Sequence, residues 1–296
     1  MDSIAWYNHE WLPAAQATLP LDDVGVLQGA VLVERLRTVR GEPLDVEQHL
    51  SRMQFGCELL EIHPPRGRDW IGLLGEVVRE CASRNRAVFG AQDFSLVVIV
   101  TPGRIGESPR LPTMIVHAAP IRWPQLKSFY RVGQPLIVAN TRNVPQECWL
   151  PQLKTRSRLH YYLADSEAAE LAQPWGGAVL LDLAGNLTET SMANLLVVEG
   201  KRIVSPPLNS ILHGVSLTRT LRLAVEMEYD VALEQLSSER AQAADEILLC
   251  GSTGCLWPAA SLEDRIFDDP VRRPVFQHLS RAWCDDISLD YVQQAS

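Results

Sequence analysis

The chain has 296 residues, of which 46% are hydrophobic and 21% are charged, as is typical of a globular protein with one or two domains. Its formal net charge is −9, and its basic clusters, such as Arg66 with Arg68, are short. A chain of this charge repels polyanions, so we expect no nucleic acid partner. No apolar run reaches membrane-spanning length, which argues against a membrane partner.

The six cysteines lie without Cys-x-x-Cys spacing. This scatter favours reduced, buried thiols over a disulfide framework or a metal site, so no metal is predicted. Residues 1–10 lack the basic stretch followed by an apolar run that marks a signal or transit peptide. We therefore predict a cytoplasmic protein.

The first half of the chain predicts an α+β domain. After Asp45, the apolar residues Leu50, Met53 and Cys57 recur at helical spacing, while other segments are β-branched or apolar and bounded by Gly and Pro. We expect strands over residues 4–7, 11–12, 30–39, 94–100 and 113–118, and helices over 46–60 and 70–83.

The second half predicts a mixed α/β domain. Between Pro120 and Pro135 the sequence shows no period, which is typical of an interdomain connector. We therefore place an N-terminal domain at residues 1–124, a connector at 125–134 and a C-terminal domain at 135–296. In the latter we expect helices over residues 157–171 and 215–227 and strands over 178–182, 194–198, 203–204 and 246–250.

Four segments of the second half could carry chemistry. Lys154 follows an apolar residue, and Glu189 lies beside the buried run 195–198, where an acid needs a partner. Gly214 precedes a predicted helix whose amino end could bind a phosphate. Residues 248–254 form a strand that leads into small hydroxyl residues, which can approach an anion closely. Taken singly, each segment is also compatible with an ordinary turn, cap or surface charge.

In their order and spacing, these segments resemble the class IV aminotransferase family, over roughly residues 4–260. The family includes branched-chain aminotransferases, D-amino acid aminotransferases and 4-amino-4-deoxychorismate lyases. The matching segments are residues 29–37, 41–52, 153–155, 185–189 with Asn194, 211–216, and 245–246 with 251–252.

The resemblance implies a two-domain α/β enzyme of fold type IV, with pyridoxal 5'-phosphate in the cleft between the domains. It also implies a homodimer in which loop 102–110 closes the site of the partner subunit. Lys154 would carry the cofactor as a Schiff base. The other implied cofactor contacts are Arg52, Val215, Ser216 and Ser252 for the phosphate and Glu189 for the pyridine nitrogen.

The chemistry of these residue types agrees with the implied roles. An ionised carboxylate at Glu189 keeps a pyridine nitrogen protonated, so that the ring can accept electrons. The amine of Lys154, released when a substrate amine replaces it, can take and return the substrate Cα proton.

The substrate positions depart from the family pattern. Gln28 replaces the usual aromatic residue before Gly29, Val33 replaces a common phenylalanine, and Arg158 with Leu159 replaces the Asn-Tyr pair of branched-chain enzymes. The Arg158-Leu159 pair looks more like the lyase or D-amino acid branches. Because a guanidinium suits carboxylate recognition, further substrate candidates are arginines, together with a hydroxyl residue next to Ser252. These candidates are Arg37, Arg104 and Thr253.

Three functions follow from these observations. The first is a transaminase that moves an amino group between an amino acid or another primary amine and a 2-oxo acid. The second is a lyase that releases pyruvate and 4-aminobenzoate from 4-amino-4-deoxychorismate. The third is a non-catalytic binding relative, against which the intact Lys154 and Glu189 argue.

Overall fold

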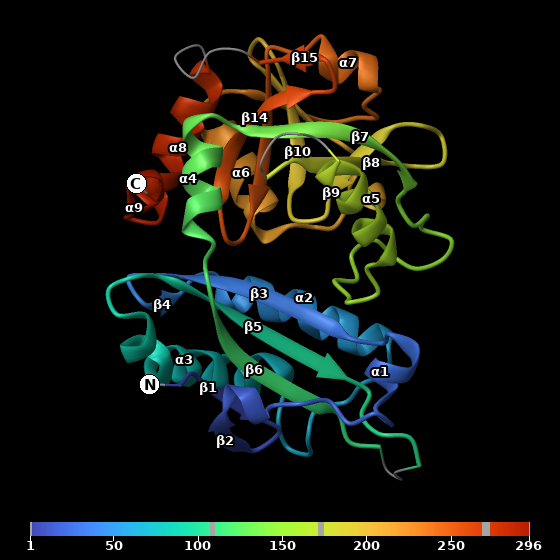
Figure 1. Ribbon diagram of the computed structural model, residues 1–296, viewed down its shortest axis with the longest axis vertical. Helices are drawn as coiled ribbons and strands as arrows, with labels where there is room; N and C mark the ends of the chain where they lie inside the picture. The colour runs from blue at the N-terminus through green and yellow to red at the C-terminus, as the bar shows by residue number, and fades with distance from the viewer. Residues whose placement is uncertain (1, 107–109, 171–174, 268–272, 296) are drawn as a thin grey trace. The chain divides into compact units, whose positions relative to one another are not determined.

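The computed structural model describes residues 2–106, 110–170, 175–267 and 273–295. The chain divides into two compact units (Figure 1). Unit 1 holds the residues up to Ile121 together with Leu153–Ser157, and unit 2 holds Arg122–Gln152 and the chain from Arg158 onward. The predicted N-terminal boundary therefore lies close to the division, but the segment around Lys154 belongs to unit 1 and not to the C-terminal part of the chain.

Unit 1 is built on a six-stranded sheet whose neighbours are all antiparallel, in the order β2-β1-β6-β5-β3-β4. Its strands are β1 (Ile4–Tyr7), β2 (Glu10–Pro13), β3 (Leu32–Val39), β4 (Glu42–Pro43), β5 (Phe94–Thr101) and β6 (Thr113–Pro120). Five of these strands, all except β4, were predicted to within two residues at each end, and with the helices they form an α+β unit.

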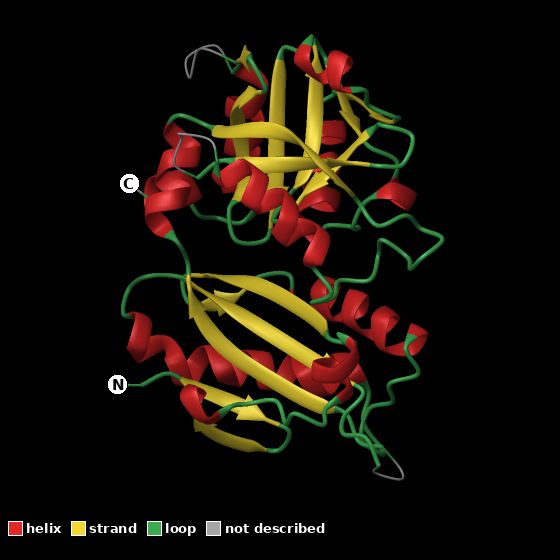
Figure 2. Ribbon diagram, turned by 45° about the vertical axis from the view of Figure 1, so that its right-hand side comes forward, coloured by secondary structure: helices red, strands yellow, loops and turns green. Residues whose placement is uncertain are grey.

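Helices α2 (Val46–Leu59) and α3 (Trp70–Phe89) cover one face of this sheet (Figure 2). Both were predicted, although α3 continues six residues beyond its predicted end. The Asp69 side chain accepts a hydrogen bond from Gly72 N (2.7 Å) and so caps α3. Asp45, by contrast, precedes α2 with a left-handed backbone and no side-chain cap bond. Two shorter helices complete the unit, η1 (Ala14–Gln16) and α1 (Val24–Gln28).

Unit 2 contains a nine-stranded mixed sheet that closes on itself. Its order is β12-β11-β10-β13-β14-β7-β8-β9, with β15 beside β14, and β9 also pairs with β10. This last pairing, Glu189 opposite Asn194, closes six of the strands into a ring. The strands are β7 (Gln134–Arg142), β8 (Gly177–Leu181), β9 (Leu187–Thr190), β10 (Asn194–Glu199), β11 (Arg202–Ser205), β12 (Asp230–Leu233), β13 (Glu246–Gly251), β14 (Cys255–Leu262) and β15 (Arg265–Ile266).

Helices pack around this ring and complete the core of unit 2. Trp257 on β14 stacks on Phe129 at 5.6 Å between ring centroids and donates its indole N–H to Gln134 Oε1 (2.9 Å). Buried alanines pack one helix, α5, against β7 and β8. The helices are α4 (Trp123–Arg131), α5 (Leu159–Ala169), η2 (Leu208–Ser210), α6 (Val215–Glu226), α7 (Ser238–Gln242), α8 (Pro274–Asp286) and α9 (Tyr291–Gln294).

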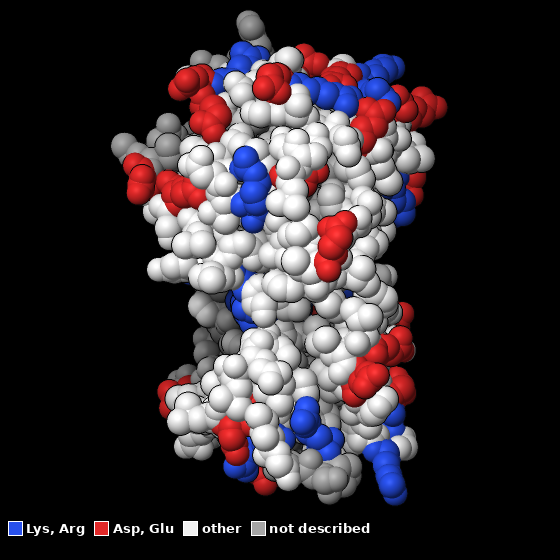
Figure 3. Space-filling view, turned by 90° about the vertical axis from the view of Figure 1, so that its right-hand side faces the viewer, with Lys and Arg blue, Asp and Glu red and all other residues white. Residues whose placement is uncertain are grey.

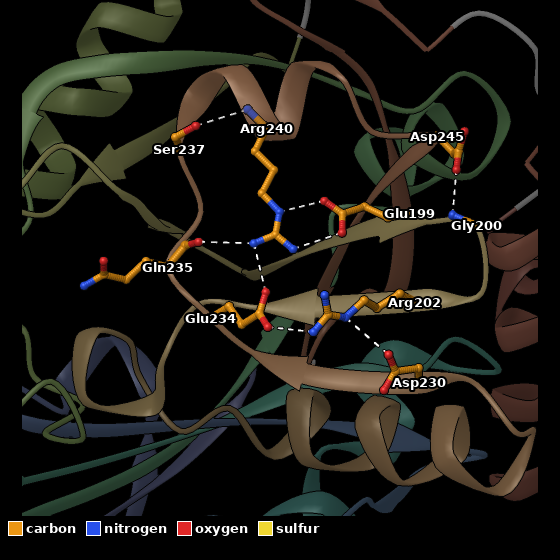
Figure 4. Close-up of polar contacts among 9 residues, drawn as sticks. All are labelled: Glu199, Gly200, Arg202, Asp230, Glu234, Gln235, Ser237, Arg240 and Asp245. Carbon is orange, nitrogen blue, oxygen red and sulfur yellow. Dashed lines mark hydrogen bonds and ion pairs between the residues drawn. The ribbon is translucent and has the colours of Figure 1, made fainter.

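An ion-pair network ties α7 to the β10–β11–β12 edge (Figure 4). The guanidinium of Arg240 contacts both oxygens of Glu199 (2.7 and 2.9 Å) and Glu234 Oε2 (3.0 Å). Arg202 contacts the other oxygen of Glu234 (2.6 Å) and Asp230 (3.2 Å). All of these groups are partly exposed, so the network positions the edge more than it stabilises the fold.

At residues 125–134 the structure differs from the prediction of an interdomain connector. Most of it is helix α4, which begins at Trp123 with a proline in its first turn. A proline there costs little, because the first N–H groups of a helix have no partner within the helix. The aperiodic, proline-containing sequence therefore concealed a helix.

The surface fits the acidic composition. On the face drawn in Figure 3, acidic and basic side chains of the described residues are interspersed, without a broad basic patch. None of the described helices is long and apolar enough to cross a membrane.

Candidate active site

Lys154 lies in a short extended segment paired with β3. Val33 N donates to Lys154 O, and Arg156 N donates to Val31 O, both at 2.9 Å. The segment thus adds an antiparallel bridge at the start of β3, between Leu32 and Thr155. The helix predicted to begin near this lysine begins at Leu159 instead. The backbone of Lys154 is therefore fixed by strand pairing, which holds the base of its side chain in a defined place.

Arg52 forms a buried cluster with Glu34 and His49 in unit 1. Its Nε and Nη2 donate to the two oxygens of Glu34, both at 2.7 Å, and His49 Nδ1 lies 2.7 Å from Glu34 Oε2. Burial alone would raise the pKa of Glu34, but the charge and hydrogen bonds of Arg52 and His49 outweigh it and lower that pKa to about 2. The bidentate pair fixes the plane of the Arg52 guanidinium.

Glu189 is buried at the seam where β9 meets β10. Its Oε1 accepts hydrogen bonds from Tyr161 Oη (2.8 Å) and from Leu212 N (3.1 Å), and its Oε2 accepts one from Asn194 Nδ2 (2.8 Å). The expectation that this acid needs partners is therefore met by donors from a helix, a loop and a strand. These donors hold the carboxylate in one orientation.

The amino end of α6 is locked to the same cluster. Asn194 Nδ2 also donates to Leu212 O (2.9 Å), and a Cβ on Gly214 would lie only 2.0 Å from Asn194 Oδ1. Gly214 is the N-cap of α6, and no side chain caps the helix there. The predicted phosphate contacts Val215 and Ser216 are thus the first two residues of an α6 whose N–H groups point towards its amino end.

The turn between β13 and β14 holds Ser252 and Thr253, both half-buried. Gly251 precedes them, and its Cβ position lies 2.7 Å from Met192 O, in the turn between β9 and β10. Cys250 pairs with Asn194 in the β10–β13 ladder. Unit 2 therefore brings this turn, the Glu189 cluster and the start of α6 to one end of the ring.

Tyr161 is a residue that sequence reasoning missed. It lies on α5, 28 positions before Glu189, and a single tyrosine on a helix carries no signal of such a contact. Burial raises its pKa well above the ordinary value, and the charge of Glu189 raises it further, so the phenol stays protonated and donates. Arg158 lies over its ring at 4.4 Å and donates to Ser191 O. Arg158, which in the sequence is only a departure from the family pattern, therefore packs on Tyr161 in the structure and supports it.

The other substrate candidates occupy different parts of unit 1. Gln28 is the exposed last residue of helix α1, and Val33 is buried on β3. Arg37 is 1% exposed, donates to Thr38 O (3.1 Å) and lies 3.9 Å from Asp93. Arg104 forms an exposed pair with an aspartate, Asp22, at 2.7 Å. Residues 107–109 of loop 102–110 lie outside the described residues.

The donor set fits a phosphate-bearing pyridine cofactor. A buried carboxylate suits a protonated ring nitrogen, and the amino end of α6 with its adjacent hydroxyls suits a phosphate. The close contact at Gly214 leaves no room for a larger residue in this cradle. The described residues contain no group of three His, Cys, Asp or Glu side chains suited to a metal ion.

Comparison with known proteins agrees with this arrangement. The chain is 24% identical over 288 residues to branched-chain-amino-acid aminotransferase-like protein 2 of Arabidopsis thaliana, covering 95% of this chain and 49% of the relative. The chain thus spans about half the length of that relative. The fold matches the branched-chain aminotransferase of Escherichia coli with a TM-score of 0.86 at 19% identity, covering 96% and 94% of the two chains.

Two further solved structures are similar. A branched-chain aminotransferase of T.th., solved with pyridoxamine 5'-phosphate, matches with a TM-score of 0.84 at 19% identity, covering 97% and 94% of the chains. The 4-amino-4-deoxychorismate lyase of Pseudomonas aeruginosa matches with a TM-score of 0.75 at 25% identity, covering 97% and 99%. The sequence model of the family "Amino-transferase class IV" matches residues 31–262, and the protein therefore belongs to the class IV aminotransferase family.

Proposed function

We propose that the protein is a pyridoxal phosphate-dependent aminotransferase that moves an amino group between an amino acid or another primary amine and a 2-oxo acid. The observation that carries this proposal is the Glu189 cluster, because a buried carboxylate with donors fixed from three elements is the group that a protonated pyridine nitrogen requires. Family membership supports the same chemistry.

Each residue of the site has a separate proposed role. Lys154 would hold the cofactor through Nζ and then move the substrate Cα proton with the same atom. Glu189 would orient the ring and hold the proton on its nitrogen, while Val215, Ser216 and Ser252 would bind the phosphate with N–H and hydroxyl groups. Arg52 would add positive charge near the phosphate, with its orientation set by Glu34. When bound, the cofactor supplies the electron sink that makes the Cα proton removable.

A second candidate is 4-amino-4-deoxychorismate lyase activity. It is favoured by the match to the Pseudomonas aeruginosa lyase, which covers nearly all of both chains, and by Arg158 and Leu159 in place of an Asn-Tyr pair. Both reactions begin with removal of the same Cα proton, so the same lysine serves either one. For either activity we propose that the protein is a homodimer in the cytoplasm.

Product analysis of the purified, cofactor-loaded protein separates the two. With amino acids and 2-oxo acids as substrates, a transaminase exchanges the amino group and yields a new 2-oxo acid. With aminodeoxychorismate alone, a lyase yields pyruvate and 4-aminobenzoate. Lys154→Ala should abolish either activity and the visible absorbance of the bound cofactor, whereas unchanged absorbance in that variant contradicts both candidates.

A further inference from the structure

Helices α8 and α9 follow the part of the chain that matches the family model, which ends at residue 262. Helix α8 packs against α6, the helix whose amino end is proposed to bind the cofactor phosphate (Figure 1). Two arginines of α6, Arg219 and Arg222, form ion pairs with Asp286 on α8, and the guanidinium of Arg219 lies 5.2 Å from the centre of the Trp283 ring. The C-terminal segment is therefore attached directly to α6.

A relay of two hydrogen bonds, from Trp283 through Thr220 to Ser216, connects α8 with the first turn of α6. The indole Nε1 of Trp283 donates to Thr220 Oγ1 (3.0 Å), and Thr220 Oγ1 donates in turn to Ser216 O (2.7 Å). All three residues are buried. Removal of one member therefore leaves a buried polar group without its hydrogen bond, which is more costly than the loss of an exposed one.

The direction of the relay follows from the chemistry of its members. An indole N–H can only donate, so it occupies a lone pair of the Thr220 hydroxyl. That hydroxyl has a single proton, which it donates to the carbonyl oxygen of Ser216, four residues earlier in the helix. The Ser216 carbonyl and the Leu217 N–H belong to one planar peptide group. Trp283 therefore acts, through Thr220, on the direction of the Leu217 N–H.

The Leu217 N–H belongs to the first turn of α6, which begins at Val215. The N–H groups of a first turn have no acceptor within their own helix, and they point towards its amino end. Together with the helix dipole, they are the groups that bind a phosphate at such a position. The relay thus ends on the turn that is proposed to bind the cofactor phosphate.

We infer that Trp283 is a positioning residue for the cofactor phosphate. Through Thr220 and Ser216, it holds the first turn of α6 in the orientation that directs its N–H groups at the phosphate. This role also gives a function to the C-terminal segment, which lies beyond the family match. The inference rests on the proposed function, because it takes the amino end of α6 to be the phosphate site.

Titration of the full, cofactor-free chain with pyridoxal phosphate and with pyridoxal tests the inference, because pyridoxal lacks the phosphate. Trp283→Phe removes the indole N–H and keeps an aromatic ring. We expect the dissociation constant for pyridoxal phosphate to rise about fivefold, as the loss of one buried hydrogen bond allows, and that for pyridoxal to stay unchanged. Thr220→Val breaks the same relay with a side chain of similar size, so it should act alike and serves as the test should Trp283→Phe not fold. Thr220→Ser keeps the hydroxyl and should bind both probes as the wild type does.

Tyr291→Phe is the matched control within the C-terminal segment. The buried Tyr291 hydroxyl lies 2.8 Å from Ser280 Oγ on α8 and donates to Leu256 O on β14 (3.2 Å), neither of which belongs to α6. Its loss should lower the urea midpoint, as Trp283→Phe does, but leave both dissociation constants unchanged.

Three results overturn the inference: an unchanged dissociation constant for pyridoxal phosphate in Trp283→Phe, an equal rise for both probes in that variant, or an equal rise in Tyr291→Phe. If the wild type binds pyridoxal phosphate more tightly than pyridoxal in these cases, the proposed function stands. If the wild type shows no preference for the phosphate, both the inference and the proposed phosphate site fall.

Discussion

The hydroxyl group of Tyr161 offers a sharp test of the Glu189 cluster. Tyr161→Phe removes only the donor that lies 2.8 Å from Glu189 Oε1 and keeps the ring that packs under Arg158. A hydrogen bond to a charged acceptor contributes about 1.5–3 kcal/mol, more than a neutral one. We expect the free energy of unfolding to fall by that amount.

The assay is urea unfolding of the cofactor-free protein, in which a loss of about 2 kcal/mol lowers the midpoint by roughly 1 M. Tyr162→Phe is the matched control, because Tyr162 is the next residue of the same helix and its side chain is 69% exposed. Its effect should stay within about 0.5 kcal/mol.

Cofactor affinity gives a second readout. Without the Tyr161 hydroxyl, the Glu189 carboxylate loses one of the donors that orient it. The dissociation constant for pyridoxal phosphate should therefore rise roughly tenfold. If Tyr161→Phe and Tyr162→Phe unfold at the same urea concentration and bind the cofactor equally, the bond neither stabilises the fold nor positions Glu189, and the reasoning is refuted.

Two further predictions concern the acid–base and steric properties of the site. Because the pKa of Glu34 falls from 4.5 to about 2 on folding, its ionised form contributes about 3 kcal/mol above pH 4.5, and this stability is lost as the pH falls towards 2. Urea midpoints measured across this range should fall less in Glu34→Gln than in the wild type; parallel curves would contradict the assignment. Gly214→Ala would place a Cβ 2.0 Å from Asn194 Oδ1, so it should cost about 1–3 kcal/mol and weaken cofactor binding, and a variant as stable as the wild type in urea would show that the contact relaxes freely.

Segments with a clear hydrophobic pattern were the most predictable part of the fold. The helix after Asp45 follows from apolar residues at helical spacing, and the strands at residues 94–100 and 113–118 follow from short apolar runs bounded by Gly and Pro. They agree with α2, β5 and β6. Some of the elements that sequence reasoning missed begin with or contain proline, as in α4, α8 and β14, whereas others, such as β12 and α7, are short segments without proline. A proline at the start of a helix is neutral, but in the sequence alone it resembles a break.

The candidate site was predictable only where a residue type and its chain position coincide with the family pattern. Lys154 and Glu189 were selected in this way, but their partners were not. Tyr161 reaches Glu189 through the packing of α5 against the ring, a long-range contact that no local pattern encodes. Arg37 was chosen for its guanidinium, yet its burial with Asp93 depends on the order of strands in the sheet.

The assignment of Leu153–Ser157 to unit 1 has a consequence for biosynthesis. Neither unit is a continuous stretch of chain, since the five residues around Lys154 come after 31 residues of unit 2, Arg122–Gln152. A nascent chain that ends at Ile121 does not yet contain the segment that pairs with the first residues of β3. These residues can pair only after Lys154 has left the ribosome. Maturation of the first unit is therefore tied to synthesis of the second, and no single cut between Ile121 and Arg158 yields two intact halves.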